Sequence, residues 1–321
     1  MIETVDLNSP NASGGIEAAL SSIGFVQLVG HGLDSSVRKQ LRSAADQFFD
    51  LDHSVKSGFV HEDPAANRGY RARGSEALSY SLGEESPPDL FESFNASPAP
   101  TIEHPLLQAT PWPDEVVPGF SNAVEDAFAD FSKLAARLDQ IVDDILGIDW
   151  LASRSGEGPD ALVNINYRPD PDGNEEVVAG QKRMGAHTDY TTFTLLDAEP
   201  VAGLQIVSPS GEWVDVTPDA EAVLMNVGDV LAMMTNNAWP STLHRVVPMA
   251  AGAAPFRRSV AFFHYPNLDV EFGPLDAFVS DERPPQYDPV TVADHLLAKL
   301  VAPKVREAAT GASTAAGRVT S

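Results

Sequence analysis

The segment Gly185-Ala186-His187-Thr188-Asp189-Tyr190 decides how this sequence of 321 residues is interpreted. Side chains alternate between the two faces of a β-strand, so His187 and Asp189, two residues apart, would share one face. Another histidine, His244, follows on a later predicted strand. We therefore expect His187, Asp189 and His244 to meet around one metal ion.

Composition restricts the metal chemistry, because the chain has no cysteine and 8 histidines. Thiolate-bound zinc, iron–sulfur clusters and thiol nucleophiles are excluded, and a metal must be held by imidazole and carboxylate groups. Two histidines and one carboxylate leave three octahedral positions open, which is the facial arrangement of non-haem Fe(II) oxygenases. Taken alone, a His-x-Asp pair with a distant histidine also occurs by chance among polar residues on solvent-exposed faces.

A second pair of polar residues lies on the predicted strand Arg257–Tyr265. Strand alternation puts Arg257 and Ser259 on one face, among apolar side chains. A buried guanidinium needs an anion, and its planar fork matches one carboxylate of a dicarboxylic acid, with the serine hydroxyl donating beside it. The alternative is that Arg257 pairs with one of the protein's own carboxylates. His264 falls on the opposite face of this strand and is expected to be structural.

The region between residues 162 and 265 consists of short β-rich runs separated by turn residues. This pattern is typical of an antiparallel sandwich or jelly roll. The predicted strands are Leu162–Tyr167, His187–Leu195, Gly203–Val207, Glu212–Val216, Ala222–Asn226, Val230–Met234, Thr242–Val247 and Arg257–Tyr265.

Helices are predicted on both sides of this β-rich region, because apolar residues recur there at helical spacing. They run from Leu33 to Phe48 with Asp34 as the cap, from Phe120 to Ile145, and from Val290 to about Leu300. A strand is expected at residues 24–29, and the loop-rich stretch 51–111 is expected to lie over another part of the protein. The expected fold class is mostly β with flanking helices: a jelly-roll core with an N-terminal helical layer.

Many sequence blocks, in the right order, resemble the isopenicillin N synthase-like branch of iron(II)- and 2-oxoglutarate-dependent oxygenases. The blocks are Gly24–Leu33, Asn164–Pro169, His187–Asp189, Gly203–Ile206, Gly211–Val216, Asn226–Asp229, Thr235–Asn237, Ser241–Val246 and the pair Arg257 and Ser259. The similarity spans nearly the whole chain. The chain departs from the family at Arg168, where a tyrosine is common, and at residues 250–254, which lengthen a connection.

The resemblance implies a double-stranded β-helix with the two histidines and Asp189 as iron ligands. It further implies that Arg257 and Ser259 hold the distal carboxylate of 2-oxoglutarate, with Asn166 as another cofactor contact. The cofactors implied are Fe(II), 2-oxoglutarate and O2, and a small molecule is hydroxylated or desaturated with release of succinate and CO2.

The sequence patterns, together with this resemblance, divide the chain into regions. They are an N-terminal non-haem dioxygenase region at 1–112, a long helix and connection at 113–157, the jelly-roll oxygenase core at 158–270, a C-terminal helix region at 271–310 and a flexible tail at 311–321.

The net charge of −25 makes nucleic acid an unexpected partner, because phosphate would be repelled. A membrane span is not expected, since no apolar stretch approaches about 20 residues, and the acidic start lacks the features of a secretory signal. We therefore expect a cytoplasmic protein.

Candidate substrate contacts lie in the cationic cluster Arg68, Arg71 and Arg73 with Tyr70. This cluster is on a loop expected at the mouth of the barrel. Arg68, Tyr70 and Arg71 would recognise an anionic group, unless the arginines simply pair with the acidic surface. Arg168 and Phe193 are further candidates for the pocket wall.

Two alternative functions stay open on the sequence. One is an Fe(II)-dependent oxidase of the same fold that does not use 2-oxoglutarate, since such relatives keep the Arg-x-Ser pair. The other is a non-catalytic binding protein, which is disfavoured because it would need neither the metal ligands nor the anion-binding pair Arg257 and Ser259. A halogenase is disfavoured by Asp189, because halide takes the place of that carboxylate.

Overall fold

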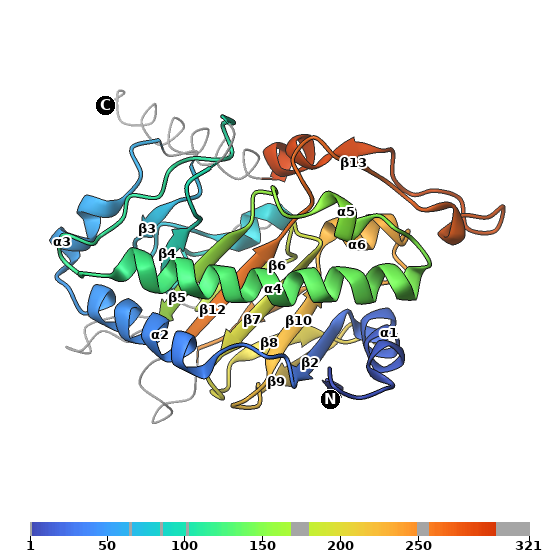
Figure 1. Cartoon of the computed structure of the whole chain (residues 1–321), viewed down its shortest axis with the longest axis horizontal. Coiled ribbons are helices and arrows are strands. Elements are labelled where there is room, and N and C mark those ends of the chain that lie inside the picture. Colours follow the sequence, from blue (N-terminus) through green and yellow to red (C-terminus); the bar gives the residue numbers. More distant parts are fainter. Residues whose placement is uncertain are drawn as a thin grey trace, which may run out of the picture.

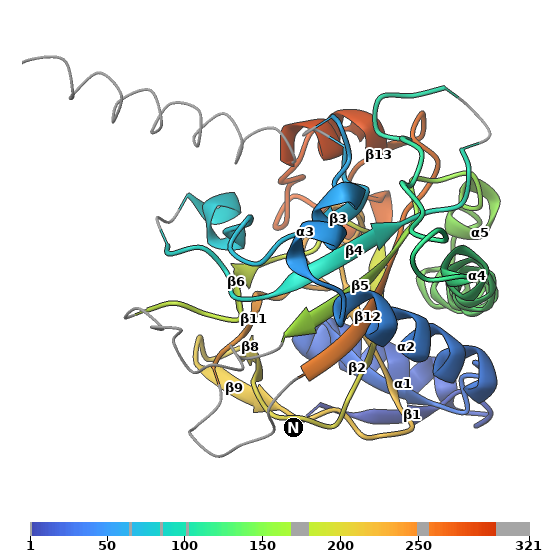
Figure 2. The ribbon, with the colours of Figure 1, turned by 90° about the vertical axis from the view of Figure 1, so that its left-hand side faces the viewer.

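The computed structural model describes residues 2–63, 66–83, 86–100, 103–167, 180–248 and 257–299. Two β-sheets lie one behind the other, and helices cover the outer face of the larger sheet (Figures 1 and 2). This is the predicted mostly-β fold with a jelly-roll core. None of the helices in the described part of the chain has both the length and the apolar character needed to cross a bilayer.

The larger sheet has eight strands in the order β1-β2-β10-β7-β12-β5-β4-β3. Their bounds are β1 Thr4–Asp6, β2 Phe25–Val29, β10 Val223–Val227, β7 Phe193–Ala198, β12 Arg257–His264, β5 Ala161–Tyr167, β4 Glu92–Ala96 and β3 Gly69–Arg71. β12 is central, with Ala261 opposite Leu196 of β7 on one side and Val163 of β5 on the other. These three side chains point to the inner face, toward the second sheet.

The second sheet has four strands in the order β6-β11-β8-β9. Their bounds are β6 Met184–His187, β11 His244–Val246, β8 Leu204–Val207 and β9 Trp213–Val216. A two-stranded ladder of β13 (Glu271–Phe272) and β14 (Val290–Thr291) precedes a helical segment at 292–299.

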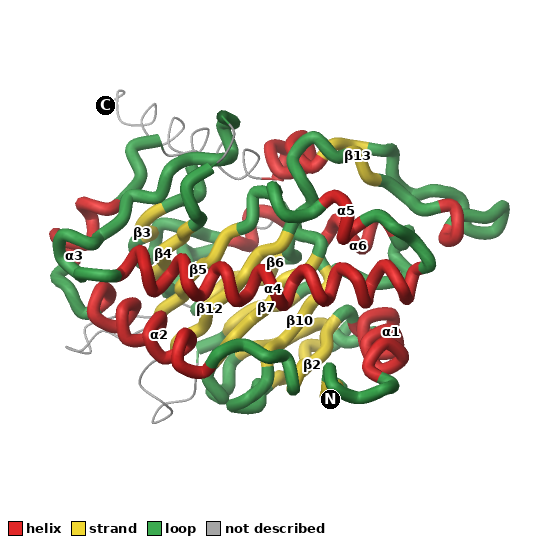
Figure 3. The backbone as a smooth tube through the Cα atoms, in the orientation of Figure 1, coloured by secondary structure: helices red, strands yellow, loops and turns green. Residues whose placement is uncertain are grey.

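The longer helices pack against the larger sheet on the side away from the second sheet (Figures 2 and 3), whereas the short helical turn at residues 78–82 packs against β6 of the second sheet. The α-helices are α1 Ala12–Ile23, α2 Ser35–Phe49, α3 His53–Lys56, α4 Phe120–Leu146, α5 Leu151–Arg154 and α6 Asp229–Met234, and the 3-10 turns are η1 Ser57–Phe59, η2 Leu78–Leu82 and η3 Asp276–Phe278. The apolar stripe of α4 brings Phe131 onto Phe262 of β12, with ring centroids 5.6 Å apart. The predicted cap is confirmed, because the carboxylate of Asp34 accepts from the backbone N–H of Ser36 at 2.7 Å.

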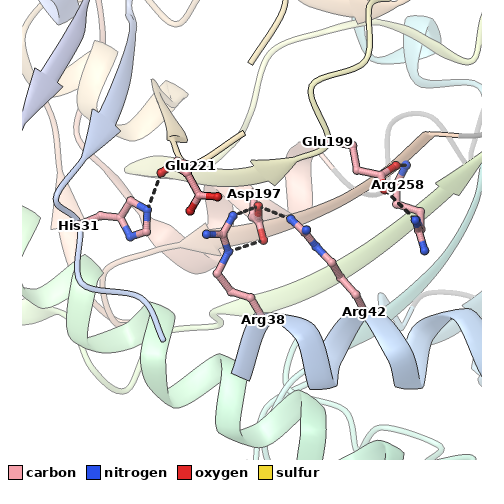
Figure 4. A network of polar contacts seen from close by, with 7 residues as sticks. All are labelled: His31, Arg38, Arg42, Asp197, Glu199, Glu221 and Arg258. Carbon is pink, nitrogen blue, oxygen red and sulfur yellow. Dashed lines mark hydrogen bonds and ion pairs between the residues drawn. The ribbon is translucent and has the colours of Figure 1, made fainter. Parts of the chain in front are cut away.

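Charged side chains fix α2 on the outer face of the larger sheet (Figure 4). Arg38 donates twice to Asp197 of β7, at 2.6 and 2.9 Å, and Arg42 adds a third bond of 2.7 Å. Arg258 of β12 bonds Glu199 at 2.7 Å and also contacts Asp46 of α2. These ion pairs belong to the face of the sheet opposite the inner one.

Several predicted elements are wrong in detail. Val230–Met234 forms α6, because a short apolar run does not distinguish a buried helix from a buried strand. The predicted strand His187–Leu195 is interrupted: β6 ends at His187 and β7 begins at Phe193. The stretch predicted as loop-rich contributes the edge strand β3 and its neighbour β4, and α1 was not predicted. The predicted tail at 311–321 lies outside the described residues.

A buried histidine joins α4 to the sheet. His264, at the end of β12, contacts Asp160 through Nδ1 at 2.8 Å and Asp139 of α4 through Nε2 at 2.9 Å. Burial alone would lower the pKa of His264, but the two carboxylates outweigh it and raise the pKa to about 10. His264 therefore has a structural role, as predicted, and its two carboxylate partners favour the imidazolium form.

We expect the free energy of unfolding to fall between pH 6.5 and 10, because the unfolded chain loses the His264 proton near pH 6.5 and the folded chain keeps it to about pH 10. The stabilisation is complete below pH 6.5 and lost as pH rises through the folded pKa, a change of several kcal/mol. Urea titrations of wild type and His264→Gln at both ends of this range measure it. His53→Gln, an exposed histidine, is the control, and equal pH dependence in wild type and His264→Gln would contradict the assignment.

Candidate active site

A cavity of about 210 Å³ lies between the two sheets. Met184 of β6 and Leu204 of β8 line it from the smaller sheet, while Val163 and Leu196 line it from the larger one. The polar groups reaching this apolar space include those singled out in the sequence: His187, Asp189, His244, Arg257 and Ser259.

Strand pairing brings the three predicted metal ligands together. His244 of β11 lies directly opposite His187 of β6 in the antiparallel ladder. Asp189 stands just beyond the end of β6 rather than on the strand, and its Oδ1 lies 3.8 Å from Nε2 of each histidine. The three candidate ligand atoms lie within 4.8 Å of one another, which is a spacing that one metal ion could bridge.

The other polar atoms of these three residues are occupied by the protein. Nδ1 of His187 donates to the carbonyl of Gly185 at 2.8 Å, and Nδ1 of His244 donates to that of Thr242 at 3.2 Å. Asn226 donates to Oδ2 of Asp189 at 2.7 Å. Both Nε2 atoms and Oδ1 are left facing one another, and such outer contacts are what orient metal ligands.

Protonation in the cluster also suits a metal. Burial lowers the pKa of His187 to about 4, with the neighbouring His244 acting in the same direction, so the imidazole is neutral. Burial opposes ionisation of Asp189, but the two histidines and Asn226 bring the pKa of its carboxyl below the ordinary value. A neutral imidazole and an ionised carboxylate are the forms that ligate metals.

Arg257 and Ser259 form an anion grip on the inner face of β12. Arg257 is only 5% exposed, and its Nη1 donates to the hydroxyl of Ser259 at 3.3 Å. Its Nε and Nη2 are buried without a hydrogen-bond partner. Burial lowers the pKa of Arg257 to about 10, and the nearby charge of Arg183 adds to this effect. The orphaned donors fit a carboxylate supplied by a ligand.

Two residues near the site were not singled out in the sequence. Arg183 is buried close enough to Arg257 for their charges to interact, and Asn226 holds the carboxylate of Asp189. Arg183 lies outside the motifs, and Asn226 begins the block Asn226–Asp229, which gives no sign of its partner because Asp189 is distant in sequence.

Two predicted contacts are not in the cavity. Asn166 is on the opposite face of β5, where its amide donates to Glu92 at 3.1 Å. Phe193 lies in the apolar core beside His264, with ring centroids 4.8 Å apart, because the turn after Asp189 breaks the strand alternation. Thr194 takes its expected place in the cavity wall.

The predicted substrate loop is divided by the edge strand β3. Tyr70 is 1% exposed in the core under α2, and its hydroxyl donates to Glu92 at 2.7 Å, so it does not reach the cavity. Arg71 is bonded to the carbonyl of Ala66 and lies 4.0 Å from Glu76. Arg68 is buried and donates to the backbone carbonyl of Asn67, which lines the cavity, but Arg68 itself is not among the lining residues. Arg168 lies outside the described residues.

The fold and this cluster define a jelly-roll protein with a buried His-Asp-His site beside an anion grip. The sequence profile of the 2OG-Fe(II) oxygenase superfamily matches residues 159–266, and that of the N-terminal region of non-haem dioxygenases in morphine synthesis matches residues 2–115. A 2-oxoglutarate-dependent dioxygenase of Monascus ruber is 30% identical over 305 residues, covering 88% of this chain and 86% of the relative.

Two further proteins are similar to this chain over most of its length. Validamycin A dioxygenase of Streptomyces hygroscopicus subsp. limoneus is 28% identical over 271 residues, covering 82% of this chain and 73% of the relative. The crystal structure of a full-length Neurospora crassa protein in complex with α-ketoglutarate and thymine superposes with a TM-score of 0.81 at 26% identity, covering 94% of this chain and 96% of the other.

The chain belongs to the 2OG-Fe(II) oxygenase superfamily. It is an Fe(II)/2-oxoglutarate-dependent dioxygenase, and its cofactors are Fe(II), 2-oxoglutarate and O2.

Proposed function

We propose that His187, Asp189 and His244 bind the Fe(II), and that Arg257 with Ser259 binds the distal carboxylate of 2-oxoglutarate. The observation that carries this assignment is that two sets of polar atoms without protein partners lie in one cavity. One set consists of three metal-ligand atoms within 4.8 Å, and the other consists of the orphaned Nε and Nη2 of Arg257.

Each residue has a definite task in this proposal. The backbone carbonyls of Gly185 and Thr242 fix the tautomers of the two histidines, so both present Nε2. Asn226 keeps Oδ1 of Asp189 turned inward. When bound, iron with 2-oxoglutarate supplies the activation of dioxygen and the oxidising power. The apolar walls, such as Leu196 and Phe263, keep water from the reacting groups.

We propose that the substrate is a small molecule, which is hydroxylated or desaturated while 2-oxoglutarate is converted to succinate and CO2. The cavity volume of about 210 Å³ supports a substrate of limited size. Relatives with validamycin A and with thymine in their names support the same size class. Phe91, Leu78 and Tyr265 add an apolar and aromatic wall to which such a molecule would bind.

The test is to supply purified protein with Fe(II), 2-oxoglutarate and O2 and to count succinate. We expect succinate to form in an amount equal to the 2-oxoglutarate consumed. The rate of succinate formation should be low without a substrate and higher when a tested panel of small molecules contains a substrate. Zn(II)-loaded protein is the control and should form none. Oxygen uptake with a substrate but without succinate would favour the cosubstrate-free oxidase instead.

A further inference from the structure

Three uncharged polar side chains line one side of the cavity, apart from the residues proposed to hold the metal and the cosubstrate. Ser93 and Asn95 of β4 both face inward and are 1% and 5% exposed. The hydroxyl of Ser93 donates to Oδ1 of Asn95 at 3.0 Å, and Nδ2 of Asn95 donates to Oδ1 of Asn67 at 2.6 Å. Asn67, just before β3, also lines the cavity. We call Ser93, Asn95 and Asn67 the polar strip.

The hydrogen bonds of the polar strip run in one direction and end at a donor. The Oδ1 atoms of Asn95 and Asn67 both accept from a neighbour within the strip, so Nδ2 of Asn67 stands at the end of the series. In the part of the chain that the structure describes, no protein group accepts a hydrogen bond from this Nδ2. An amide nitrogen carries two protons, and a donor beside apolar walls favours a ligand that accepts from it.

The backbone holds Asn67 in this position. Gly69, two residues later, lies opposite Asn95 in the ladder of β3 and β4 and has a φ of 79°. A Cβ on Gly69 would lie 2.4 Å from the carbonyl oxygen of Phe59, so a larger residue does not fit there. Nη1 of Arg68 donates to the backbone carbonyl of Asn67 at 2.8 Å. The amide of Asn67 is therefore fixed before any ligand arrives, as a recognition group should be.

An apolar strand separates the polar strip from the anion grip of Arg257 and Ser259. In the register of the larger sheet, Ile165 of β5 lies between Ser93 of β4 and Ser259 of β12. Two strand spacings of about 4.8 Å put the backbones of these two serines roughly 10 Å apart. The two histidines belong to the smaller sheet, so a cosubstrate between Arg257 and the metal would cross the cavity. The polar strip is left to a second ligand.

The charges of the cavity wall favour an uncharged second ligand. Among the described residues that line the cavity, Arg257 is the only arginine and there is no lysine. Arg257 is assigned to the cosubstrate, so a second anion would meet no cationic side chain. The carboxylate of Glu76, which also lines the cavity, lies 4.0 Å from Nε of Arg71. Burying an unpaired charge costs far more than burying a neutral group that forms its hydrogen bonds.

We propose that the substrate is an uncharged molecule with a carbonyl group, and that Nδ2 of Asn67 selects it by donating to the carbonyl oxygen. Asn95 and Ser93 are positioning residues, because they hold the amide of Asn67 with its donor end toward the cavity. This inference rests on the proposed function, since it names the class of the second ligand of the same cavity.

The first test compares end groups on one scaffold. The probes are benzamide, benzoate and benzylamine, together with the carboxamide, carboxylate and aminomethyl derivatives of cyclohexane. The protein is loaded with Zn(II) and an excess of 2-oxoglutarate, so that no turnover occurs, and ligand-observed NMR titrations give the dissociation constants. We expect wild type to bind each carboxamide about 5-fold or more tightly than the carboxylate or the amine of the same scaffold, which is the range of one net hydrogen bond.

The second test replaces the donor by an acceptor. Asn67→Asp keeps an oxygen that accepts from Asn95 but puts a carboxylate oxygen in the place of Nδ2. Carboxamide binding should weaken about 10-fold or more, and the amines should become the preferred probes. Asn122→Asp makes the same change at an exposed position of α4 outside the cavity and should keep the wild-type order. Ser93→Ala, which removes only a bond to Asn95, should weaken carboxamide binding less than Asn67→Asp.

Two results would overturn the inference: wild type that shows no preference for the carboxamides, or Asn67→Asp that keeps this preference. Failure of the proposed function is a different result, because it is seen in wild type alone as an absence of succinate from 2-oxoglutarate, whereas the NMR titrations need no turnover.

Discussion

Protein carrying Asp189→Ala is expected to lose Fe(II) binding and the formation of succinate. Asp189 is the one carboxylate among the three ligand atoms that lie within 4.8 Å, and without it two neutral imidazoles would have to hold the cation. Loss of an outer contact to a metal ligand typically costs 10–100-fold in affinity or activity, and loss of the ligand itself should exceed this range. Competition with a chromogenic chelator under anaerobic conditions measures the affinity.

Two variants serve as references for Asp189→Ala. Asn226→Ala removes only the bond to Oδ2, so its loss of affinity should fall within about 10–100-fold. His53→Ala removes an exposed imidazole outside the cavity and should bind iron as wild type does. If folded Asp189→Ala protein keeps wild-type iron affinity, the metal site has been assigned wrongly.

Arg257→Ala should weaken 2-oxoglutarate binding by about 2–5 kcal/mol, or roughly 30- to 5,000-fold in dissociation constant. The guanidinium is buried, and its Nε and Nη2 lack protein partners, so the ligand carboxylate is their counterion. Calorimetric titration of Fe(II)-loaded protein with 2-oxoglutarate in the absence of oxygen measures the change. The affinity for iron should be the same as in wild type.

The adjacent residue is a matched control for Arg257. Arg258 lies on the same strand but faces the outer side of the sheet, where it bonds Glu199. Arg258→Ala should therefore lower stability and leave the dissociation constant of 2-oxoglutarate unchanged. An Arg257→Ala protein with an unaltered 2-oxoglutarate titration would favour the oxidase that works without this cosubstrate.

The sequence predicted the central features of the site because short-range spacing carries them. Arg257 and Ser259 share a face through the alternation of a regular strand, and that strand is continuous in the structure. Asp189 meets the two imidazoles as expected, but strand alternation is not the reason: the strand ends at His187, and the turn that follows brings the carboxylate to them.

Other parts of the site depend on long-range pairing, which spacing does not reveal. Asn166 belongs to a block that resembles the family, yet its position in the ladder turns it toward Glu92. Tyr70 lies in the core because β3 joins the sheet edge, whereas Asn67, just before this strand, lines the cavity. A loop prediction could not separate these neighbours.

The most direct test of the central claim is a crystal structure of the protein loaded with Fe(II) and 2-oxoglutarate without oxygen, with anomalous data at the iron edge. We expect one iron peak in coordination contact with Nε2 of His187, Nε2 of His244 and Oδ1 of Asp189. We also expect the distal carboxylate of 2-oxoglutarate to bind Arg257 and Ser259. Iron bound elsewhere, or a 2-oxoglutarate carboxylate that leaves Arg257 unpaired, would contradict it.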